Sequence, residues 1–464
     1  MSIENTHYGA ARIGKMLSAC QSIFFIGIGG ISMSALAEVS LQNGYRVGGS
    51  DRSESALTSR LKALGAEIFY GHDAANMKNY DAAVYTVAID ADNPEYLAAK
   101  QAGKPLISRS DYLGYLMTAY ERRVGIAGMH GKSTCTAMCA SIFAYAADPT
   151  VFCGAALPGL GNSPCVIGHA RDAFVFEACE YMDSFLDFNP TLAVVLNIGM
   201  DHVDYFHSME QIRTSFLRYA ERTGKDGTLL YNADDAESRR AFASFVGRKL
   251  TFGLRQQADF TARNIKQDRG LTSFDFCRDG TFLCRITLRT CGQHNIYNAL
   301  AAASAATLCG ILPEQIAAGL GSFCGAARRM EYKGTCNGAD VYDDYGHHPD
   351  EIAATLEGAR QLGYDRVICA YQPHTYSRTA GLLEEFSNAF VDADVVLFAD
   401  IYAAREENVY GVSSKQLAEK IGDKARYCGS FEAVADAIKQ IAKQGDLVIV
   451  MGAGDIFKTF GYLE

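Results

Sequence analysis

A strand, a glycine-rich loop and the start of a helix follow one another in Arg123-Val124-Gly125-Ile126-Ala127-Gly128-Met129-His130-Gly131-Lys132-Ser133-Thr134. The apolar residues form the strand, and helical sequence continues from Cys135 to about Ala146. Glycines let backbone N–H groups turn toward one anion, and the helix N-terminus adds partial positive charge. Lys132 can neutralise β- and γ-phosphate oxygens, and Ser133 can ligate Mg²⁺. We therefore expect this loop to bind a nucleoside triphosphate.

The loop departs from the strict phosphate-binding pattern at one position. That pattern has glycine five residues before Gly131, where this chain has Ile126, flanked by Gly125 and Gly128. A glycine-rich turn with an exposed lysine is the alternative interpretation. The order of strand, loop and helix favours phosphate binding, and the candidate contacts are Gly128, His130, Gly131, Lys132, Ser133 and Thr134.

Length and composition narrow the class of protein. The chain has 464 residues, which suits about three domains, and 48% of them are hydrophobic. No apolar run is long enough for a membrane span, and the polar N-terminus argues against a secretory signal. The net charge of −10, without a basic tract, argues against nucleic-acid partners. The 14 cysteines include no C-x-x-C pair, so we expect a reducing cytoplasm and no zinc ribbon. The sequence gives no oligomeric state.

Strands alternate with helices almost throughout, which predicts an α/β fold with largely parallel sheets. The first unit, residues 1–120, and the third, residues 327–464, are expected to be Rossmann-like. The central unit, residues 121–326, is expected to resemble a P-loop ATPase. Within it, a period-two pattern from about Leu250 to Leu288 predicts a small antiparallel excursion.

A second glycine-rich loop follows the first predicted strand, Ile23–Gly27. It contains Gly27, Gly29 and Gly30, but Ser32 replaces the third glycine of a dinucleotide fingerprint. Asp51 follows the next strand, near the spacing of an acid that contacts a ribose hydroxyl. An NAD site, a site for another nucleotide diphosphate and a tight turn all remain open. A diphosphate site separate from the triphosphate loop would mean two phosphorylated ligands.

Polar residues close two predicted strands of the central unit. Glu177-Ala178-Cys179-Glu180 ends one strand, and Asn197-Ile198-Gly199-Met200-Asp201-His202-Val203-Asp204 ends the other. The carboxyl ends of parallel strands share one edge, so we expect Glu177 beside the phosphate loop as an oxygen ligand for Mg²⁺. The second run indicates another metal position or a phosphate contact. A solvated acidic loop and a lone surface histidine are the alternatives.

Three further predicted helices open on polar residues. Asn295 can cap the helix Asn295–Cys309, and amide side chains there can also reach an adenine edge. In the third unit, Asp343-Asp344-Tyr345-Gly346-His347-His348-Pro349 and Gln372-Pro373-His374-Thr375-Tyr376-Ser377-Arg378-Thr379 follow strands. Pro349 suits a first helical turn. Asp344, His348 and Arg378 form a polar group too dense for a turn that only connects.

Taken in order, with the Arg328-Arg329 pair, these motifs resemble the Mur ligase family from about Phe24 to Gly454. The missing loop glycine is normal in that family. The resemblance implies three domains that bind a UDP-sugar, ATP and an amino acid in turn. It also implies an ATP-dependent ligase of peptidoglycan precursor synthesis, which joins L-alanine to the carboxylate of UDP-N-acetylmuramate through an acyl phosphate. A family member that couples a preformed peptide during murein recycling, an NAD-dependent oxidoreductase and a non-catalytic nucleotide switch are the alternatives.

The resemblance assigns roles to individual residues. It places Ser133 and Glu177 on one magnesium ion and His202 on a second. Where this family often has an acid, the chain has Gly199. The implied catalytic residues are Lys132, Glu177, His202, His348 and Arg378; the implied nucleotide contacts beyond the loop are Asn295, Asn298, Arg329 and Asp344; and the implied substrate contacts are Gly27, Gly29, Gly30, Ser32, Asp51, Tyr345 and His374.

Overall fold

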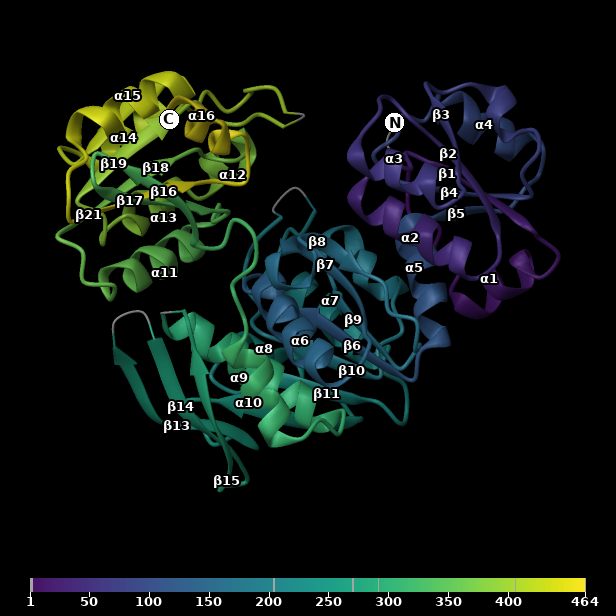
Figure 1. Cartoon of the computed structure of the whole chain (residues 1–464), viewed down its shortest axis with the longest axis horizontal. Coiled ribbons are helices and arrows are strands. Elements are labelled where there is room, and N and C mark those ends of the chain that lie inside the picture. The colour runs from purple at the N-terminus through teal and green to yellow at the C-terminus, as the bar shows by residue number, and fades with distance from the viewer. Residues whose placement is uncertain (1–2, 203–204, 269–270, 291, 405, 464) are drawn as a thin grey trace.

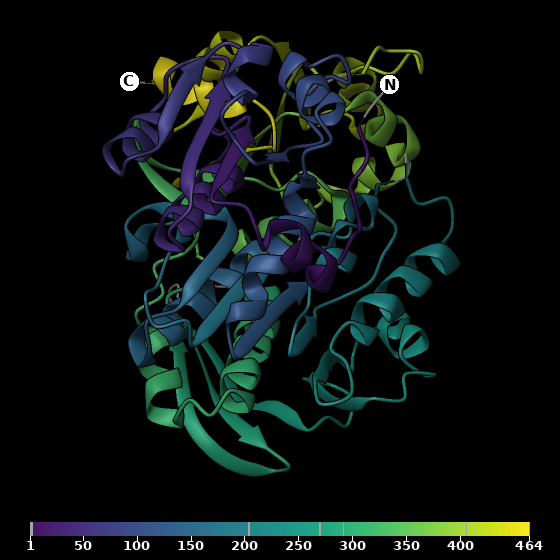
Figure 2. The ribbon, with the colours of Figure 1, turned by 90° about the vertical axis from the view of Figure 1, so that its right-hand side faces the viewer.

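Three sheets, flanked by helices, follow one another along the chain in the computed structural model, which describes residues 3–202, 205–268, 271–290, 292–404 and 406–463 (Figure 1). The first and third units both lie against the same end of the middle unit, as Figures 1 and 2 show from two directions. The sheets are mostly parallel, so the predicted α/β fold class is confirmed.

The first unit is a five-stranded parallel sheet in the order β3-β2-β1-β4-β5. β1 is buried along its whole length, and the strand order reverses beside it. Ligands of open α/β sheets bind at such a reversal, outside the carboxyl ends of the strands. The strands are β1 Ser22–Ile26, β2 Arg46–Asp51, β3 Glu67–Tyr70, β4 Ala82–Tyr85 and β5 Leu106–Ser108; the helices are α1 Ala10–Leu17, α2 Ile31–Gln42, α3 Ala56–Ala63, α4 Pro94–Gln101 and α5 Arg109–Leu116, with 3₁₀ turns η1 Ala74–Met77 and η2 Met117–Ala119.

The middle unit is a ten-stranded sheet in the order β15-β14-β13-β12-β11-β10-β6-β9-β7-β8. β6 lies between β10 and β9 and is parallel to both, so the carboxyl ends of these three strands meet at one edge. The expected antiparallel excursion is confirmed in β13, β14 and β15, which extend the main sheet at its far end. The strands are β6 Arg122–Ala127, β7 Thr150–Leu157, β8 Ser163–Val166, β9 Ala173–Glu177, β10 Leu192–Val195, β11 Thr228–Asn232, β12 Arg248–Gly253, β13 Phe260–Asp268, β14 Leu271–Arg278 and β15 Thr281–Leu288.

Alanine-rich helices cover the phosphate-loop side of the middle unit. α6 packs against α9, whose buried face is made largely of alanines, and small side chains let the two helices approach closely. α9 begins at Gln293 after the N-cap Gly292, so the prediction that Asn295 caps it is wrong, and Asn295 lies in the first turn. The helices are α6 Lys132–Ala146, α7 Met209–Glu221, α8 Ala236–Ala241, α9 Gln293–Leu308 and α10 Pro313–Gly321, with 3₁₀ turns η3 Pro158–Leu160 and η4 Tyr181–Asp187.

The third unit is a six-stranded sheet in the order β16-β17-β21-β18-β19-β20, antiparallel only at β16. Pro349 occupies the first turn of α11, as predicted. The strands are β16 Glu331–Cys336, β17 Ala339–Asp344, β18 Arg366–Tyr371, β19 Val395–Ala399, β20 Ala425–Gly429 and β21 Asp446–Met451; the helices are α11 Pro349–Arg360, α12 Tyr376–Gly381, α13 Leu383–Ala389, α14 Ser414–Ile421, α15 Phe431–Ile441 and α16 Phe460–Leu463, with the 3₁₀ turn η5 Ile456–Thr459.

A buried carboxylate joins the first unit to the middle one. Asp187, at the end of η4, accepts a hydrogen bond from Ser110 Oγ at 2.5 Å and lies 2.5 Å from His7 Nδ1. Gly114 of α5 passes so close that a Cβ there would lie 2.0 Å from the Asp187 carbonyl oxygen. Two units are therefore in contact through backbone as well as side chains. No helix in the described ranges is both long and apolar enough to cross a membrane.

Candidate active site

The phosphate loop connects β6 to α6 and needs its glycines. Gly131, with φ +84°, is the N-cap of α6, and a Cβ there would lie 2.5 Å from Asn298 Oδ1. Gly128 has φ +143° and approaches the end of β10. Both conformations favour glycine. Ile126, where the strict pattern has glycine, is a fully buried residue inside β6, so the turn begins only after it.

Asn197 fixes the loop from the neighbouring strand end. Its Oδ1 accepts a hydrogen bond from the His130 N–H at 2.9 Å, and its Nδ2 donates to the His130 carbonyl at 3.0 Å. The amide therefore pairs with both backbone groups of one loop residue. The sequence placed Asn197 at the start of a polar strand-end run but gave no reason to assign it this role.

Lys132 pairs with a buried acid that the sequence analysis did not single out. Its Nζ donates to both carboxylate oxygens of Glu180, at 3.0 and 3.1 Å, and to the Gly128 carbonyl at 2.6 Å. The Glu180 side chain is fully buried and also lies 3.3 Å from His202 Nε2. Burial alone would raise the pKa of Glu180, but the charges of Lys132 and His202 together outweigh it and the pKa falls. The pair is ionised inside the protein.

Ser133 and Glu177 come together as the sequence predicts. Ser133 Oγ donates to Glu177 Oε2 at 2.9 Å, and the Gly154 N–H donates to the same oxygen at 2.7 Å. A hydroxyl and a carboxylate side by side are the oxygen ligands that Mg²⁺ prefers. His202 instead faces Glu180, and its ring lies tilted beside that of Tyr181, with centroids 4.7 Å apart. Two members of the His202 motif, Val203 and Asp204, lie outside the described residues.

The third unit reaches the phosphate loop through the start of α11. Glu351 Oε1 lies 3.4 Å from His130 Nδ1 and 3.9 Å from Arg329 Nη1. The His348 ring is 4.7 Å from the His130 ring, centroid to centroid. Burial would lower the pKa of His130, but the acids at the start of α11 outweigh it and raise the pKa to about 9. His130 is therefore positively charged at neutral pH.

A second ion pair links the third and middle units. Arg378 Nη2 donates to Asp201 Oδ1 at 3.0 Å, and both side chains are nearly buried. Arg378 Nη1 also lies 3.2 Å from His374 Nδ1. Burial would raise the pKa of Asp201, but Arg378 and His202 together outweigh it and the pKa falls. Burial together with the Arg378 charge lowers the pKa of His374 to about 4, so this imidazole is neutral at pH 7.

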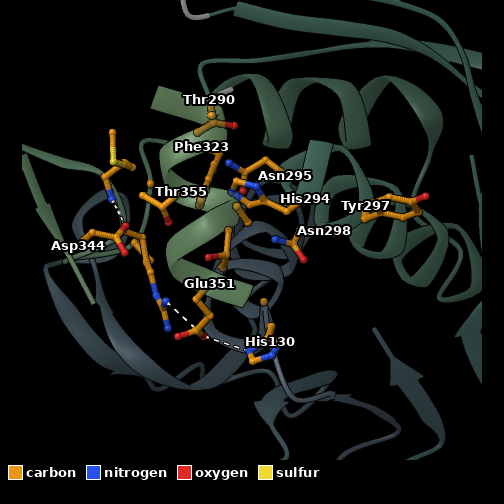
Figure 3. Close-up of a pocket in the computed structure, with 18 of the residues that line it drawn as sticks. His130, Thr290, His294, Asn295, Tyr297, Asn298, Phe323, Asp344, Glu351 and Thr355 are labelled. Carbon is orange, nitrogen blue, oxygen red and sulfur yellow. Dashed lines mark hydrogen bonds and ion pairs between the residues drawn. The ribbon is translucent and has the colours of Figure 1, made fainter. Parts of the chain in front are cut away.

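A cavity of about 800 Å³ lies where these elements meet (Figure 3). Side chains from the phosphate loop, from α9 and from α11 face into it. Phe252 and Phe323 supply apolar wall, as in most small-molecule sites. Lys132 and Ser133 lie outside its lining. Seven of the nucleotide contacts expected from the sequence do line it: His130, Gly131, Thr134, Asn295, Asn298, Arg329 and Asp344.

The residues expected on the substrate fall into two separate places. Tyr345 and His374 belong to the third unit, where the Arg328 and Arg329 guanidinium groups lie over the Tyr345 ring. In the first unit, the Gly29 N–H donates to Asp51 Oδ2 at 2.8 Å, so this acid holds its own glycine loop. The first-unit residues expected on the substrate lie apart from the cavity, on the β1–α2 loop, in the first turn of α2 or at the end of β2; they are Gly27, Gly29, Gly30, Ser32 and Asp51.

Arg109 is a cation that the sequence analysis missed beside that loop. It begins α5, directly after β5, and its Nη1 donates to Ser32 Oγ at 3.2 Å. Among the residues that the structure describes, no carboxylate lies within ion-pair distance of it, and burial lowers its pKa. A partly buried guanidinium without an acid is suited to an anionic ligand. Its position directly after a strand, where ligands of open α/β sheets bind, is the sequence signal that could have identified it.

Replacing Gly131 with alanine is expected to weaken ATP binding at least about 10-fold, because the new Cβ would collide with Asn298 at a left-handed backbone position. Gly199 is the matched control in the same site. Its backbone is not left-handed, and a Cβ there would meet only Met129 Cγ at 3.9 Å. Titration of a fluorescent ATP analogue should give unchanged affinity for Gly199→Ala. Equal affinities for both variants would contradict the steric account.

Asp344 is expected to make stability pH-dependent. Burial, only partly offset by Arg329 and two backbone N–H donors, raises its pKa from 3.8 to about 6. Between these values the folded chain holds a proton that the unfolded chain has lost, so raising the pH through this window favours unfolding. Calorimetry should show that the melting temperature falls more steeply across it in the wild type than in Asp344→Asn. Parallel curves would contradict this burial effect.

Three family models match the chain in succession. They are described as the Mur ligase family catalytic domain at residues 22–121, the Mur ligase middle domain at residues 126–306 and the Mur ligase glutamate ligase domain at residues 328–454. Together they cover most of the chain, one model for each sheet.

Similar proteins agree with these matches. The UDP-N-acetylmuramate–L-alanine ligase of Alkaliphilus metalliredigens is 42% identical, over 94% of this chain and 95% of its own length. That of Clostridium novyi is 43% identical, over 95% and 96%. The crystal structure of the UDP-N-acetylmuramate–alanine ligase of Thermotoga maritima superposes with a TM-score of 0.78 at 26% identity, covering 95% of this chain and 98% of that one. By these models and relatives, this chain belongs to the Mur ligase family.

Proposed function

We propose that this chain is an ATP-dependent ligase that joins L-alanine to the lactyl carboxylate of UDP-N-acetylmuramate. One observation carries the proposal: the phosphate loop, the α9 asparagines and residues of the third unit line one cavity. Relatives named for this reaction match the chain over 94–95% of its length at 42–43% identity. The reaction belongs to peptidoglycan precursor synthesis.

Each unit takes one ligand in this proposal. Residues 1–120 bind the UDP portion, residues 121–326 bind ATP and residues 327–464 bring the amino acid. The N-terminal glycine loop and the unpaired Arg109 support a diphosphate in the first unit, because a guanidinium fork and backbone amides both suit phosphate oxygens. Asn295, Asn298, Arg329 and Asp344 support a nucleotide in the cavity, since all four face it.

The first chemical step brings two anions together. An oxygen of the substrate carboxylate attacks the γ-phosphorus of ATP, the bond to the β-γ bridging oxygen breaks, and an acyl phosphate and ADP form. Lys132, next to the Gly128 carbonyl, lowers the repulsion by neutralising phosphate oxygens. The Ser133–Glu177 oxygen pair fits Mg²⁺, which would supply further charge neutralisation there, and we propose His202 for a second ion.

The second step requires an unprotonated amine. The nitrogen of L-alanine attacks the acyl carbon, inorganic phosphate leaves with one former carboxylate oxygen, and the amine gives up a proton. Arg378 presents a fork that suits the alanine carboxylate or the transferring phosphate. The proton goes to solvent. His374 is neutral at pH 7, because burial and Arg378 lower its pKa to about 4, so it adds no positive charge beside the amine. Tyr345 and His348 complete the amino-acid side of the site.

A murein-recycling ligase is the alternative within the family. The murein peptide ligase of Psychrobacter arcticus shares the fold, with a TM-score of 0.70 at 23% identity over 96% of this chain and 98% of that one. A panel that measures phosphate release with UDP-N-acetylmuramate and equal concentrations of L-alanine, glycine, L-serine or a tripeptide separates the two. We expect the highest kcat/KM with L-alanine. Preferential coupling of the tripeptide would contradict the proposal.

The oxidoreductase interpretation has less support. Asp51, the acid expected to contact an NAD ribose, is hydrogen-bonded to the Gly29 N–H of its own loop. We expect UDP to displace any NAD that binds to the first unit, and tight NAD binding that UDP leaves unchanged would favour an oxidoreductase. We also propose a cytoplasmic location, which the free state of every described cysteine supports.

A further inference from the structure

A cluster of two histidines and one acid lies at the junction of the middle and third units. His130 Nε2 is 3.7 Å from Asp350 Oδ2, and His348 Nδ1 is 3.6 Å from the same oxygen. One ligand atom from each residue lies within 4.8 Å of the others. Neither the expected magnesium ligands nor the Arg378 pair belongs to this cluster. It is also the only such group of three or more in the described ranges.

The distances suit a transition-metal ion. Tetrahedral zinc with bonds of about 2.0–2.1 Å sets neighbouring ligand atoms about 3.3 Å apart, within a few tenths of an ångström of both measured distances. Asp350 is exposed, so its carboxylate can turn to close the geometry. His348 is 6% exposed, and its Nε2 has no hydrogen-bond partner. The ring nitrogen that faces Asp350 is Nδ1, which accepts only a 3.3 Å hydrogen bond from the Asp350 N–H, so its lone pair is weakly engaged.

Glu351 lies within ion-pair distance of the other ring nitrogen of His130. Its Oε1 lies 3.4 Å from His130 Nδ1, the ring nitrogen opposite the one that faces Asp350. Metal-bound histidines commonly donate their other N–H to a carboxylate, which fixes the tautomer and the ring direction. An ion on His130 Nε2 would displace the proton that this nitrogen carries at neutral pH. A metal on His348 Nδ1 would replace a weak 3.3 Å hydrogen bond from the Asp350 N–H. Glu351 would still accept the His347 N–H at 3.0 Å.

We propose that His130, His348 and Asp350 bind a borderline transition-metal ion of the Zn²⁺, Co²⁺ or Ni²⁺ class, which ties the phosphate loop to α11. Two imidazoles select such ions over Mg²⁺, which prefers the all-oxygen pair of Ser133 and Glu177. His130 is two residues from Lys132, and α11 belongs to the third unit. The bound ion therefore restrains two units that must separate to exchange nucleotide, and it should inhibit turnover. This inhibitory consequence rests on the proposed function, whereas the binding does not.

Cobalt absorption tests the binding directly. The full chain, without nucleotide and with excess Mg²⁺, is titrated with Co²⁺ while visible d–d bands are recorded. We expect one equivalent to bind and Zn²⁺ to displace it. Asp350→Asn and His348→Asn should each weaken binding about 10-fold or more. Glu357→Gln, an exposed acid on the same helix, is the matched control and should bind like the wild type.

Three other results would contradict metal binding by this cluster. Absent bands, unchanged binding in both cluster variants, or a thiolate charge-transfer band that assigns the ion to cysteines would do so. Inhibition is then measured as the Zn²⁺ concentration that halves each protein's own phosphate-release rate. We expect Asp350→Asn to need about 10-fold more Zn²⁺ than the wild type or Glu357→Gln. Equal values would overturn the inhibitory link. Absence of turnover in every protein would contradict the proposed function and leave the cobalt result standing.

Discussion

Replacing Lys132 with methionine is expected to lower the turnover rate roughly 10³-fold, because the transition state loses a positive charge on the phosphate oxygens. The same change leaves Glu180 fully buried without its main cation. Breaking a buried ion pair costs about 3 kcal/mol or more. We therefore expect lower protection of α6 amides in native-state hydrogen exchange, together with the loss of phosphate release.

A double variant separates the two effects of Lys132. Lys132→Met with Glu180→Gln removes both charges, so the amide exchange of α6 should return toward the wild-type rate. Activity should stay at the level of the single variant, because the phosphate still lacks its cation. Recovery of activity in the double variant would show that Lys132 acts only by neutralising Glu180. Near-wild-type turnover in Lys132→Met would contradict the proposed chemistry outright.

Replacing Arg378 with alanine is expected to lower kcat/KM for L-alanine roughly 10³-fold, which is the other large effect. The guanidinium is the strongest anion-binding group beside His374, and it connects the third unit to Asp201. Lysine keeps the charge but not the fork, so Arg378→Lys should lie between the wild type and Arg378→Ala. Initial-rate kinetics at saturating ATP provide the measurement.

Asp201→Asn is the control for Arg378. It removes the 3.0 Å ion pair between the units and keeps the guanidinium. If Arg378 binds alanine or phosphate directly, Asp201→Asn should lower kcat/KM only about 2-fold, which is a tenth of the logarithmic loss expected for Arg378→Ala. Equal losses in the two variants would mean that the ion pair, and not anion binding, is the function of Arg378.

The backbone of the site was predictable because strand ends and glycines are local signals. Three runs that follow apolar strands place Ser133, Glu177 and His202 at one sheet edge, since β6, β9 and β10 are parallel neighbours. The first two residues of α9 were missed because the capping argument relied on Asn295, whereas Gly292 is the N-cap. The edge strands β8, β16 and β20 were missed because half-exposed strands carry a weak apolar pattern.

The partners of the predicted residues were not predictable in the same way. Glu180 belongs to a quoted motif, but only the fold shows that it, and not Glu177, pairs with Lys132. Glu351 lies on a helix 219 residues after Lys132 in the sequence, and it meets His130 only because the third unit lies against the middle one. Long-range ion pairs between units leave no periodic signal in a single sequence.

The fate of one oxygen atom tests the central claim most directly. UDP-N-acetylmuramate labelled with ¹⁸O in its lactyl carboxylate is incubated with the protein, ATP, Mg²⁺ and L-alanine, and the released phosphate is analysed by mass spectrometry. Since the carboxylate attacks the γ-phosphorus and the amine then expels phosphate, the account predicts one ¹⁸O in each phosphate released. Unlabelled phosphate, formed while the amide accumulates, would contradict an acyl phosphate.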